Sequence, residues 1–120
     1  MMLDEKTTVL LVDDDVQVLY VHEYMLLRLG ANVITANDGE EGIEIFNRKR
    51  GEIGLVITDY IMPGMDGFKF AKRVREKCLK TPIALCTGYA EGLIASELEC
   101  LDIMLLNKPM RMAAFQKLLE

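Results

Sequence analysis

The sequence lacks tryptophan altogether and is poor in cysteine, histidine and proline. Its 120 residues include three cysteines, one histidine and three prolines. The cysteines, at positions 78, 86 and 100, are odd in number and scattered along the chain. This pattern fits reduced thiols in a cytoplasmic protein better than a disulfide framework or a zinc site.

Long hydrophobic runs and an excess of basic residues are absent too. No apolar stretch approaches the length of about 18 residues that suggests a membrane span, and residues 1–6 lack the apolar segment of a signal peptide. The net charge is −5 and the charges are spread along the chain, so we expect neither nucleic-acid binding nor membrane contact. The length and the 51% hydrophobic content predict a single domain with a true core. We place this domain at residues 7–120, after an N-terminal extension at residues 1–6.

Short apolar runs alternate with longer segments of helical periodicity five times along the chain. Runs this apolar are typical of strands covered on both faces, as in a parallel sheet. Repeated strand–helix units predict an open α/β sandwich with right-handed crossovers. The predicted strands are Thr8–Val12, Val33–Ala36, Leu55–Thr58, Ile83–Cys86 and Ile103–Leu106. The predicted helices are Val16–Leu29, Gly39–Arg50, Gly67–Lys77, Gly92–Cys100 and Met110–Leu119.

Single residues mark several helix ends and faces. Asp15, Asp38 and Asp66 stand where the first three helices need an N-cap. Gly30 stands where the first helix needs a left-handed cap. His22 falls on an apolar stripe of that helix, so a packed or half-buried histidine is expected. The stripe consists of Val18, Val21, Met25 and Leu29.

Polar residues follow four of the five predicted strands. Asp13 and Asp14 come directly after the first strand, and Asp59 follows the third. Thr87 follows the fourth strand and Lys108 follows the fifth. Because ligands in open α/β sheets sit beyond the carboxyl ends of the strands, we expect these side chains to form one site.

Carboxylates crowded at the ends of buried strands raise each other's pKa and lose solvation. A hard divalent cation such as Mg²⁺ (or Mn²⁺), held through oxygen ligands, is the usual remedy. Asp59 is placed to act as a nucleophile that forms an aspartyl phosphate. The Lys108 ammonium and the Thr87 hydroxyl would then help to hold the phosphoryl group, since phosphoryl transfer needs mainly positioning and charge neutralisation.

These residues lie in four segments: residues 9–15 (VLLVDDD), 58–67 (TDYIMPGMDG), 86–88 (CTG) and 107–109 (NKP). Together these segments resemble the receiver domain of two-component response regulators, the CheY-like superfamily. The resemblance runs from Thr7 to about Leu119. It implies a flavodoxin-like (βα)5 fold with a five-stranded parallel sheet in the order 2-1-3-4-5.

The resemblance also implies a role for each residue of the site. Asp59 would be the phosphoacceptor, and Thr87 and Lys108 the pair that senses the phosphoryl group. The Lys108–Pro109 peptide bond is typically cis in this family. The implied metal ligands are Asp14, Asp59, the main-chain carbonyl of Ile61 and, mainly through metal-bound water, Asp13.

The implied donor is a phosphohistidine on a histidine kinase or a histidine phosphotransfer domain. Such a domain catalyses its own phosphorylation and slow dephosphorylation, so it is an autocatalytic phosphoacceptor and a conformational switch rather than a conventional enzyme. Residues 85–89 resemble receivers of hybrid sensor histidine kinases. The chain stops at its fifth predicted helix, so we expect a free-standing receiver or a piece of a larger protein; a weak homodimer is left open.

Two residues depart from the family pattern. Leu105 occupies the position three residues before the lysine where receivers usually carry Tyr or Phe, so readout of the signal is expected to be atypical. Leu101 stands where the family often has glycine, between the fourth helix and the fifth strand. Leucine is strained in a left-handed cap, so we expect this junction to close differently.

Two other functions compete with the receiver hypothesis. A haloacid-dehalogenase-like phosphatase would use Asp13 and Asp15 after the first strand, but it leaves Asp59 and the turn after it unexplained. A degenerate receiver would bind partners without being phosphorylated. The presence of the acidic pair together with Asp59, Thr87 and Lys108 argues against it.

Overall fold

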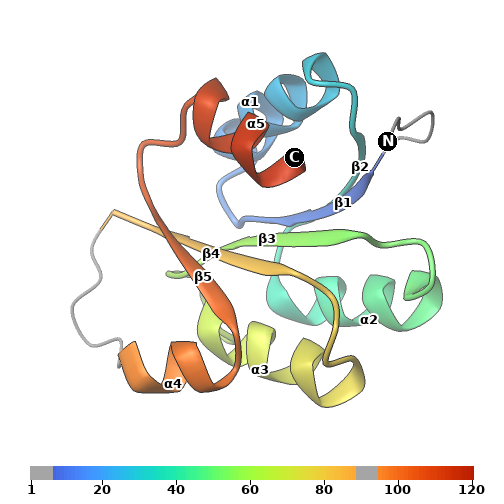
Figure 1. The fold of residues 1–120 in the computed structure, drawn as a ribbon, viewed down its shortest axis with the longest axis vertical. Coiled ribbons are helices and arrows are strands. Elements are labelled where there is room, and N and C mark those ends of the chain that lie inside the picture. Colours follow the sequence, from blue (N-terminus) through green and yellow to red (C-terminus); the bar gives the residue numbers. More distant parts are fainter. Residues whose placement is uncertain (1–6, 89–94) are drawn as a thin grey trace.

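The computed structural model describes residues 7–88 and 95–120 (Figure 1). Five parallel strands form one sheet in the order β2-β1-β3-β4-β5, which confirms the predicted fold and strand order. The strands are β1 (Thr8–Val12), β2 (Asn32–Ala36), β3 (Leu55–Asp59), β4 (Ile83–Thr87) and β5 (Ile103–Asn107). The helices are α1 (Val16–Arg28), α2 (Gly39–Lys49), α3 (Gly67–Lys77), α4 (Ala95–Cys100) and α5 (Met112–Leu119). In the described part of the chain, no helix has both the length and the apolar character needed to cross a membrane.

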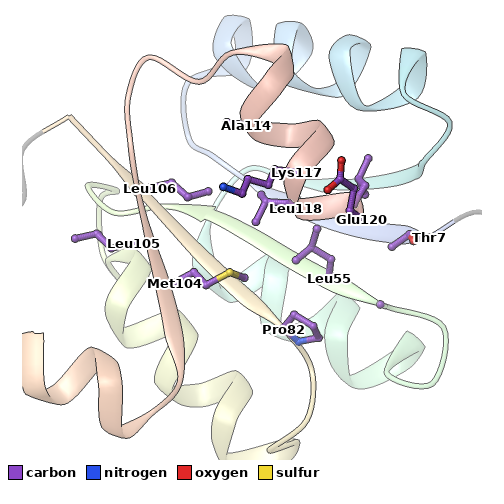
Figure 2. Close-up of a pocket in the computed structure, with 12 residues that line it drawn as sticks. Thr7, Leu55, Pro82, Met104, Leu105, Leu106, Ala114, Lys117, Leu118 and Glu120 are labelled. Carbon is purple, nitrogen blue, oxygen red and sulfur yellow. The ribbon is translucent and has the colours of Figure 1, made fainter.

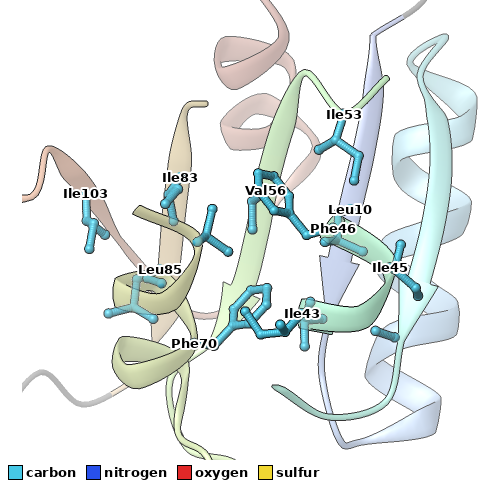
Figure 3. Close-up of a cluster of buried hydrophobic side chains, with 14 of the residues drawn as sticks. Leu10, Ile43, Ile45, Phe46, Ile53, Val56, Phe70, Ile83, Leu85 and Ile103 are labelled. Atoms are coloured by element: carbon cyan, nitrogen blue, oxygen red, sulfur yellow. The ribbon is translucent and has the colours of Figure 1, made fainter. Parts of the chain in front are cut away.

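Helices cover both faces of the sheet, as the apolar strands predict. Helices α1 and α5 lie on one face, and α2, α3 and α4 lie on the other (Figure 1). Alternate residues of each strand point to opposite faces, so Leu10 and Val56 join the core beneath α2 and α3, whereas Val9 and Ile57 join the core beneath α1 and α5. Figure 3 shows the first of these cores, in which the rings of Phe46 and Phe70 pack against the strands.

The predicted elements agree with the structure except near some ends. Each strand matches its prediction to within one residue at either end. Helix α5 starts at Met112 rather than Met110, and its N-cap Arg111 makes no side-chain capping hydrogen bond. Residues 92–94 of the predicted fourth helix lie outside the described residues.

Helix α1 begins and ends as its sequence predicts, but it buries a different row of side chains. The Asp15 carboxylate accepts hydrogen bonds from the amides of Gln17 and Val18. At the other end Gly30 has φ 96°, and the amides of Gly30 and Ala31 donate to the carbonyls of Leu27 and Leu26, which is a Schellman motif.

The predicted stripe of α1 is wrong as a description of its most buried face. Leu19 and Leu26 are the buried residues of α1, whereas Val21 is 51% exposed. Met25 and Leu29, also from the predicted stripe, are partly buried against the α1–α5 core. The sequence did not reveal this because α1 is apolar around most of its circumference, so several rows of side chains have the helical spacing.

The junction between α4 and β5 contains a residue in the left-handed conformation. The left-handed residue is Asp102, with φ 56°, and not Leu101. Aspartate tolerates this conformation better than leucine because its short polar side chain can bond locally. The buried Arg75 of α3 holds the junction, since its guanidinium donates to the carbonyls of Leu101 (2.6 Å) and Asp102 (3.1 Å).

The amino ends of the strands border an open apolar groove of about 780 Å³ (Figure 2). Its lining includes Leu55 of β3, Leu106 of β5 and Leu118 of α5. Helix α5 has only eight residues, or about 12 Å of length. At β1, β3 and β4 the groove is lined at the amino ends, away from the polar residues that follow these strands, whereas along β5 it extends to Leu106.

Candidate functional site

Three carboxylates meet at the carboxyl ends of β1 and β3. Oxygen atoms of Asp13, Asp14 and Asp59 all lie within 4.8 Å of one another. Asp13 and Asp59 are buried, at 4% and 8% exposure, while Asp14 is exposed. The two strands are hydrogen-bonded neighbours, with Val12 opposite Thr58, so residues that follow them in the chain are brought together at the edge of the sheet.

Lys108 and Thr87 reach the same place from β5 and β4. The Lys108 ammonium forms an ion pair with Asp59, at 2.5 Å between Nζ and Oδ1. The Lys108 amide donates a hydrogen bond to the Thr87 carbonyl, at 2.9 Å. Thr87 is 2% exposed, and the Lys108–Pro109 peptide bond is cis, as expected. The structure therefore brings together all five polar residues that the sequence singled out.

Burial and charge perturb the groups of this cluster. Burial raises the pKa of Asp13 to about 6; the hydrogen bond from the Asp15 amide opposes this rise, while the negative charge of Asp59 adds to it. Burial tends to lower the pKa of Lys108, but the hydrogen bond and the charge of Asp59 outweigh it and raise this pKa above its usual value. Lys108 therefore stays protonated at neutral pH.

The cluster fits a divalent cation. With all three carboxylates ionised, three negative charges less the one positive charge of Lys108 leave a local net charge of −2. Oxygen ligands are those that Mg²⁺ prefers. A cation among the carboxylates would offset the desolvation and repulsion that raise the pKa of Asp13.

The loop after β3 is held close to Asp59. The Gly67 amide, at the start of α3, donates to the Tyr60 carbonyl at 2.7 Å, and the Tyr60 amide donates to the Cys86 carbonyl at 2.9 Å. A Cβ atom at position 67 would overlap the Asp59 carbonyl oxygen. Ile61 lies in this loop with its side chain 64% exposed, and the role of its carbonyl as a ligand stays a prediction.

Gly67 was not predicted to matter for the site. The sequence feature that could have indicated its importance is its position directly after the N-cap Asp66. The need for glycine there comes from the approach of α3 to the backbone of β3, which the local sequence does not reveal.

Two other aspartates act as helix caps, as predicted. Asp15 caps α1, and the Asp66 carboxylate accepts a hydrogen bond from the Lys69 amide at 2.8 Å. Neither belongs to the carboxylate cluster of the described residues. The capping role of Asp15, and its position outside the cluster, count against the phosphatase alternative, which needed Asp13 and Asp15 as its reactive pair.

His22 and Leu105 are the two further residues that the sequence singled out near the site. The His22 ring packs edge-on against Phe115, with 5.2 Å between ring centroids. Burial lowers the pKa of His22, and the charge of Lys108 lowers it further. Leu105, at the usual aromatic position, is 39% exposed on β5.

Comparison with known proteins identifies the class. The family model described as "Response regulator receiver domain" matches residues 9–120, and the chain belongs to this family. Among solved structures, chemotaxis protein CheY4 of Vibrio cholerae is 30% identical with a TM-score of 0.85, and the match covers 96% of this chain and 97% of that one. The receiver domain of the hybrid histidine kinase CckA is 31% identical with a TM-score of 0.76, and the match covers 92% and 93% of the two chains.

Curated relatives match over a shorter stretch. The autoinducer 1 sensor kinase/phosphatase LuxN of Vibrio campbellii is 40% identical over 86 residues, which are 71% of this chain and 10% of LuxN. The alkaline phosphatase synthesis transcriptional regulatory protein PhoP of Bacillus subtilis is 34% identical over 83 residues, or 69% of this chain and 34% of PhoP. These matches thus span between a tenth and about a third of these two relatives.

Proposed function

We propose that this receiver domain accepts a phosphoryl group on Asp59 in a two-component phosphorelay. The proposal rests on one arrangement: a carboxylate cluster in which Asp59 also contacts the Lys108 ammonium. In the reaction an Asp59 carboxylate oxygen attacks phosphorus, and the bond from phosphorus to the donor imidazole nitrogen breaks. The imidazole leaves with that electron pair, and the product is an acyl phosphate.

Each neighbour of Asp59 has a part in this proposal. Asp13, Asp14, Asp59 and the carbonyl of Ile61 would hold Mg²⁺ (or Mn²⁺), which supplies neutralisation of charge on the phosphoryl oxygens. The Lys108 ammonium, already beside Asp59, remains as a contact for the phosphoryl group. Thr87 would add its hydroxyl as a further contact for the phosphoryl group; its carbonyl accepts a hydrogen bond from the Lys108 amide, so the two residues are neighbours.

A phosphorylated Asp59 would act as a switch. The phosphoryl group adds charge where Lys108 now pairs with a carboxylate, so both Lys108 and Thr87 are drawn to a new position. Thr87 is the last residue of β4 and Lys108 directly follows β5, so their movement would displace the segments that come after these strands.

We further propose that the donor is a histidine kinase or a histidine phosphotransfer domain in the cytoplasm. An apolar hollow of about 500 Å³ lies beside the site. It is lined by residues of α1 and by Lys108, Pro109 and Met110, which come before α5. The similarity to the receiver of CckA and to LuxN supports a place in a hybrid sensor kinase. Residues 7–120 would form the receiver domain, and residues 1–6 an extension before it.

The test is phosphorylation by a small acyl phosphate in the presence of Mg²⁺. Intact mass should rise by one phosphoryl group in the wild type and should not rise in Asp59→Asn. Asp66→Asn is the matched control, because Asp66 lies in the same loop region but caps α3, and it should still be modified. A mass gain that survives Asp59→Asn would refute the proposal, and so would the absence of any gain in the wild type, which favours a degenerate receiver.

A further inference from the structure

The outer side of α1 carries apolar side chains that nothing in the described fold covers. Half of the ten exposed large apolar residues in the described part of the chain lie on this helix. Four of them form a row, which we call the α1 stripe: Val16 (66% exposed), Tyr20 (71%), Tyr24 (54%) and Leu27 (51%).

The α1 stripe is continuous. Its members are spaced by four, four and three residues, which keeps them within about 80° of the helix circumference and about 16 Å of its length. Single exposed apolar residues are common on protein surfaces, but a contiguous row of large ones marks an interaction site. The outer sides of α2 and α3 differ, since Glu44, Lys69 and Lys72 project there.

The α1 stripe points away from both packed surfaces of α1. Leu19 and Leu26 bury the side that faces the sheet, and His22 packs on Phe115 of α5. At 100° per residue, Tyr20 is about 160° around the helix from His22. The stripe shares no residue with the hollow beside Lys108, which is lined by Val18, Val21 and His22 of α1, although Val21 lies next to Tyr24 on the helix surface.

Charge is distributed unequally along the row. Asp14 and Asp15 are exposed at its amino end, and Arg28 is exposed at its carboxyl end. The Arg28 guanidinium donates to the Tyr24 hydroxyl at 3.1 Å and lies 5.9 Å from the centre of its ring. Arg28 has no carboxylate partner among the described residues.

These observations point to a second copy of the chain as the partner of the stripe. We propose that two copies pair through their α1 stripes in an antiparallel, two-fold symmetric contact. Along α1, the point halfway between Val16 and Leu27 nearly coincides with the point halfway between Tyr20 and Tyr24. A two-fold axis through this point, perpendicular to the helix, pairs Tyr20 with Tyr24 and Val16 with Leu27 of the other copy. The same operation brings Arg28 of each copy near the acidic amino end of the other α1, whereas a parallel pairing would oppose like charges.

The dimer is weak. Four apolar side chains per copy bury less than the roughly 1,200 Å² found in stable interfaces. Glu23 flanks the stripe close to the two-fold axis, so the two copies of this carboxylate repel each other. The dimer therefore forms only at high protein concentration, which sets the range for its test.

Sedimentation velocity tests the contact on the whole chain from about 10 µM to about 1 mM, a range that spans weak dissociation constants. The wild type should change from monomer to dimer within this range. The double variant Tyr20→Ser, Tyr24→Ser should remain monomeric. Leu79→Ser is the matched control, because Leu79 is 80% exposed but lies outside α1, and it should dimerise like the wild type.

The antiparallel arrangement has its own readout at Gln17. In this geometry the exposed Gln17 faces Arg28 of the other copy, whereas in a parallel pair it would face its own symmetry mate. Gln17→Glu should therefore strengthen the dimer severalfold and Gln17→Lys should weaken it by a similar factor. Circular dichroism confirms that each variant is folded. A wild type that stays monomeric overturns the proposal, as does dimerisation unaffected by the double substitution, and equal effects of the two Gln17 variants overturn the antiparallel pairing.

Discussion

The face of the sheet covered by α2, α3 and α4 differs from the face covered by α1 and α5. On the first, two phenylalanines are fully buried, and the outer sides of α2 and α3 are charged (Figure 3). On the second, one phenylalanine is fully buried, α1 presents apolar side chains to solvent, and the groove beside α5 is open (Figure 2). On the first face α2 and α3 therefore turn charged sides to solvent, whereas on the second face α1 and the groove offer apolar surface to other molecules.

The largest effect should come from the buried phenylalanines. Phe70 beneath α3 and Phe115 in α5 are both fully buried. Phe70→Ala should lower the free energy of unfolding by about 4–5 kcal/mol, and Phe115→Ala by about 3 kcal/mol, since the cost depends on how far the surroundings can relax into the cavity. Urea unfolding measures both, and Phe68→Ala, which removes a partly buried ring, should cost less than either. Equal losses for Phe70 and Phe115 would mean that the two faces are packed alike.

The next effect concerns Arg75, which lies on the first of these two faces and links α3 to the segments on either side of β4. Its guanidinium donates to four carbonyls, including those of Cys78 at 3.1 Å and Thr81 at 2.7 Å. Arg75→Met should therefore destabilise the protein by about 2–3 kcal/mol, because these four carbonyls lose the charged guanidinium as their hydrogen-bond donor. Arg73→Met, on the exposed side of the same helix, is the control and should change stability by less than about 0.5 kcal/mol.

Amide hydrogen exchange would show where in the protein Arg75→Met weakens the structure. Amides at the α4–β5 junction, where Asp102 is left-handed, should exchange faster in Arg75→Met and not in Arg73→Met. Unchanged exchange at that junction would show that Arg75 does not maintain it.

The smallest expected effect is a difference in reactivity between cysteines on the two faces. A hydrogen bond with the Thr81 side chain, helped by backbone hydrogen bonds, lowers the pKa of Cys78 to about 7. Burial raises the pKa of Cys86, within the α1–α5 core, to about 12. Iodoacetamide at neutral pH should alkylate Cys78 readily and should reach Cys86 only after unfolding, because the thiolate is the reactive form.

Thr81→Val sharpens this test. Loss of the hydroxyl should raise the pKa of Cys78, reduce its thiolate fraction at pH 7 and slow its alkylation severalfold. The rate at the exposed Cys100 serves as the internal reference and should not change. An unchanged rate at Cys78 would rule out the hydrogen bond as the cause of its reactivity.

Much of the fold and of the candidate site was predictable from the sequence. Apolar runs marked the strands, and Asp15, Asp38, Asp66 and Gly30 marked helix ends, because capping depends on residues close in the chain. Asp13, Asp14, Asp59 and Lys108 could be grouped before the structure was known, since parallel strands direct their carboxyl ends to one edge. The resemblance to receivers supplied the strand order, which the structure confirms, and the roles proposed for these residues.

Other features depended on contacts between distant segments. The four acceptors of Arg75 include two that lie 26 and 27 residues further along the chain. Asp102 took the left-handed conformation that was considered for Leu101. The requirement for glycine at position 67 came from the backbone of β3.

The sequence by itself determined the order of the elements, their main caps and the edge at which the polar groups collect. These follow from local periodicity, local hydrogen bonds and the direction of parallel strands. Only the tertiary structure decided which row of α1 is buried and which row faces solvent. The reason is that α1 is apolar on several sides, so its burial depends on the positions of the sheet and α5 rather than on its own pattern.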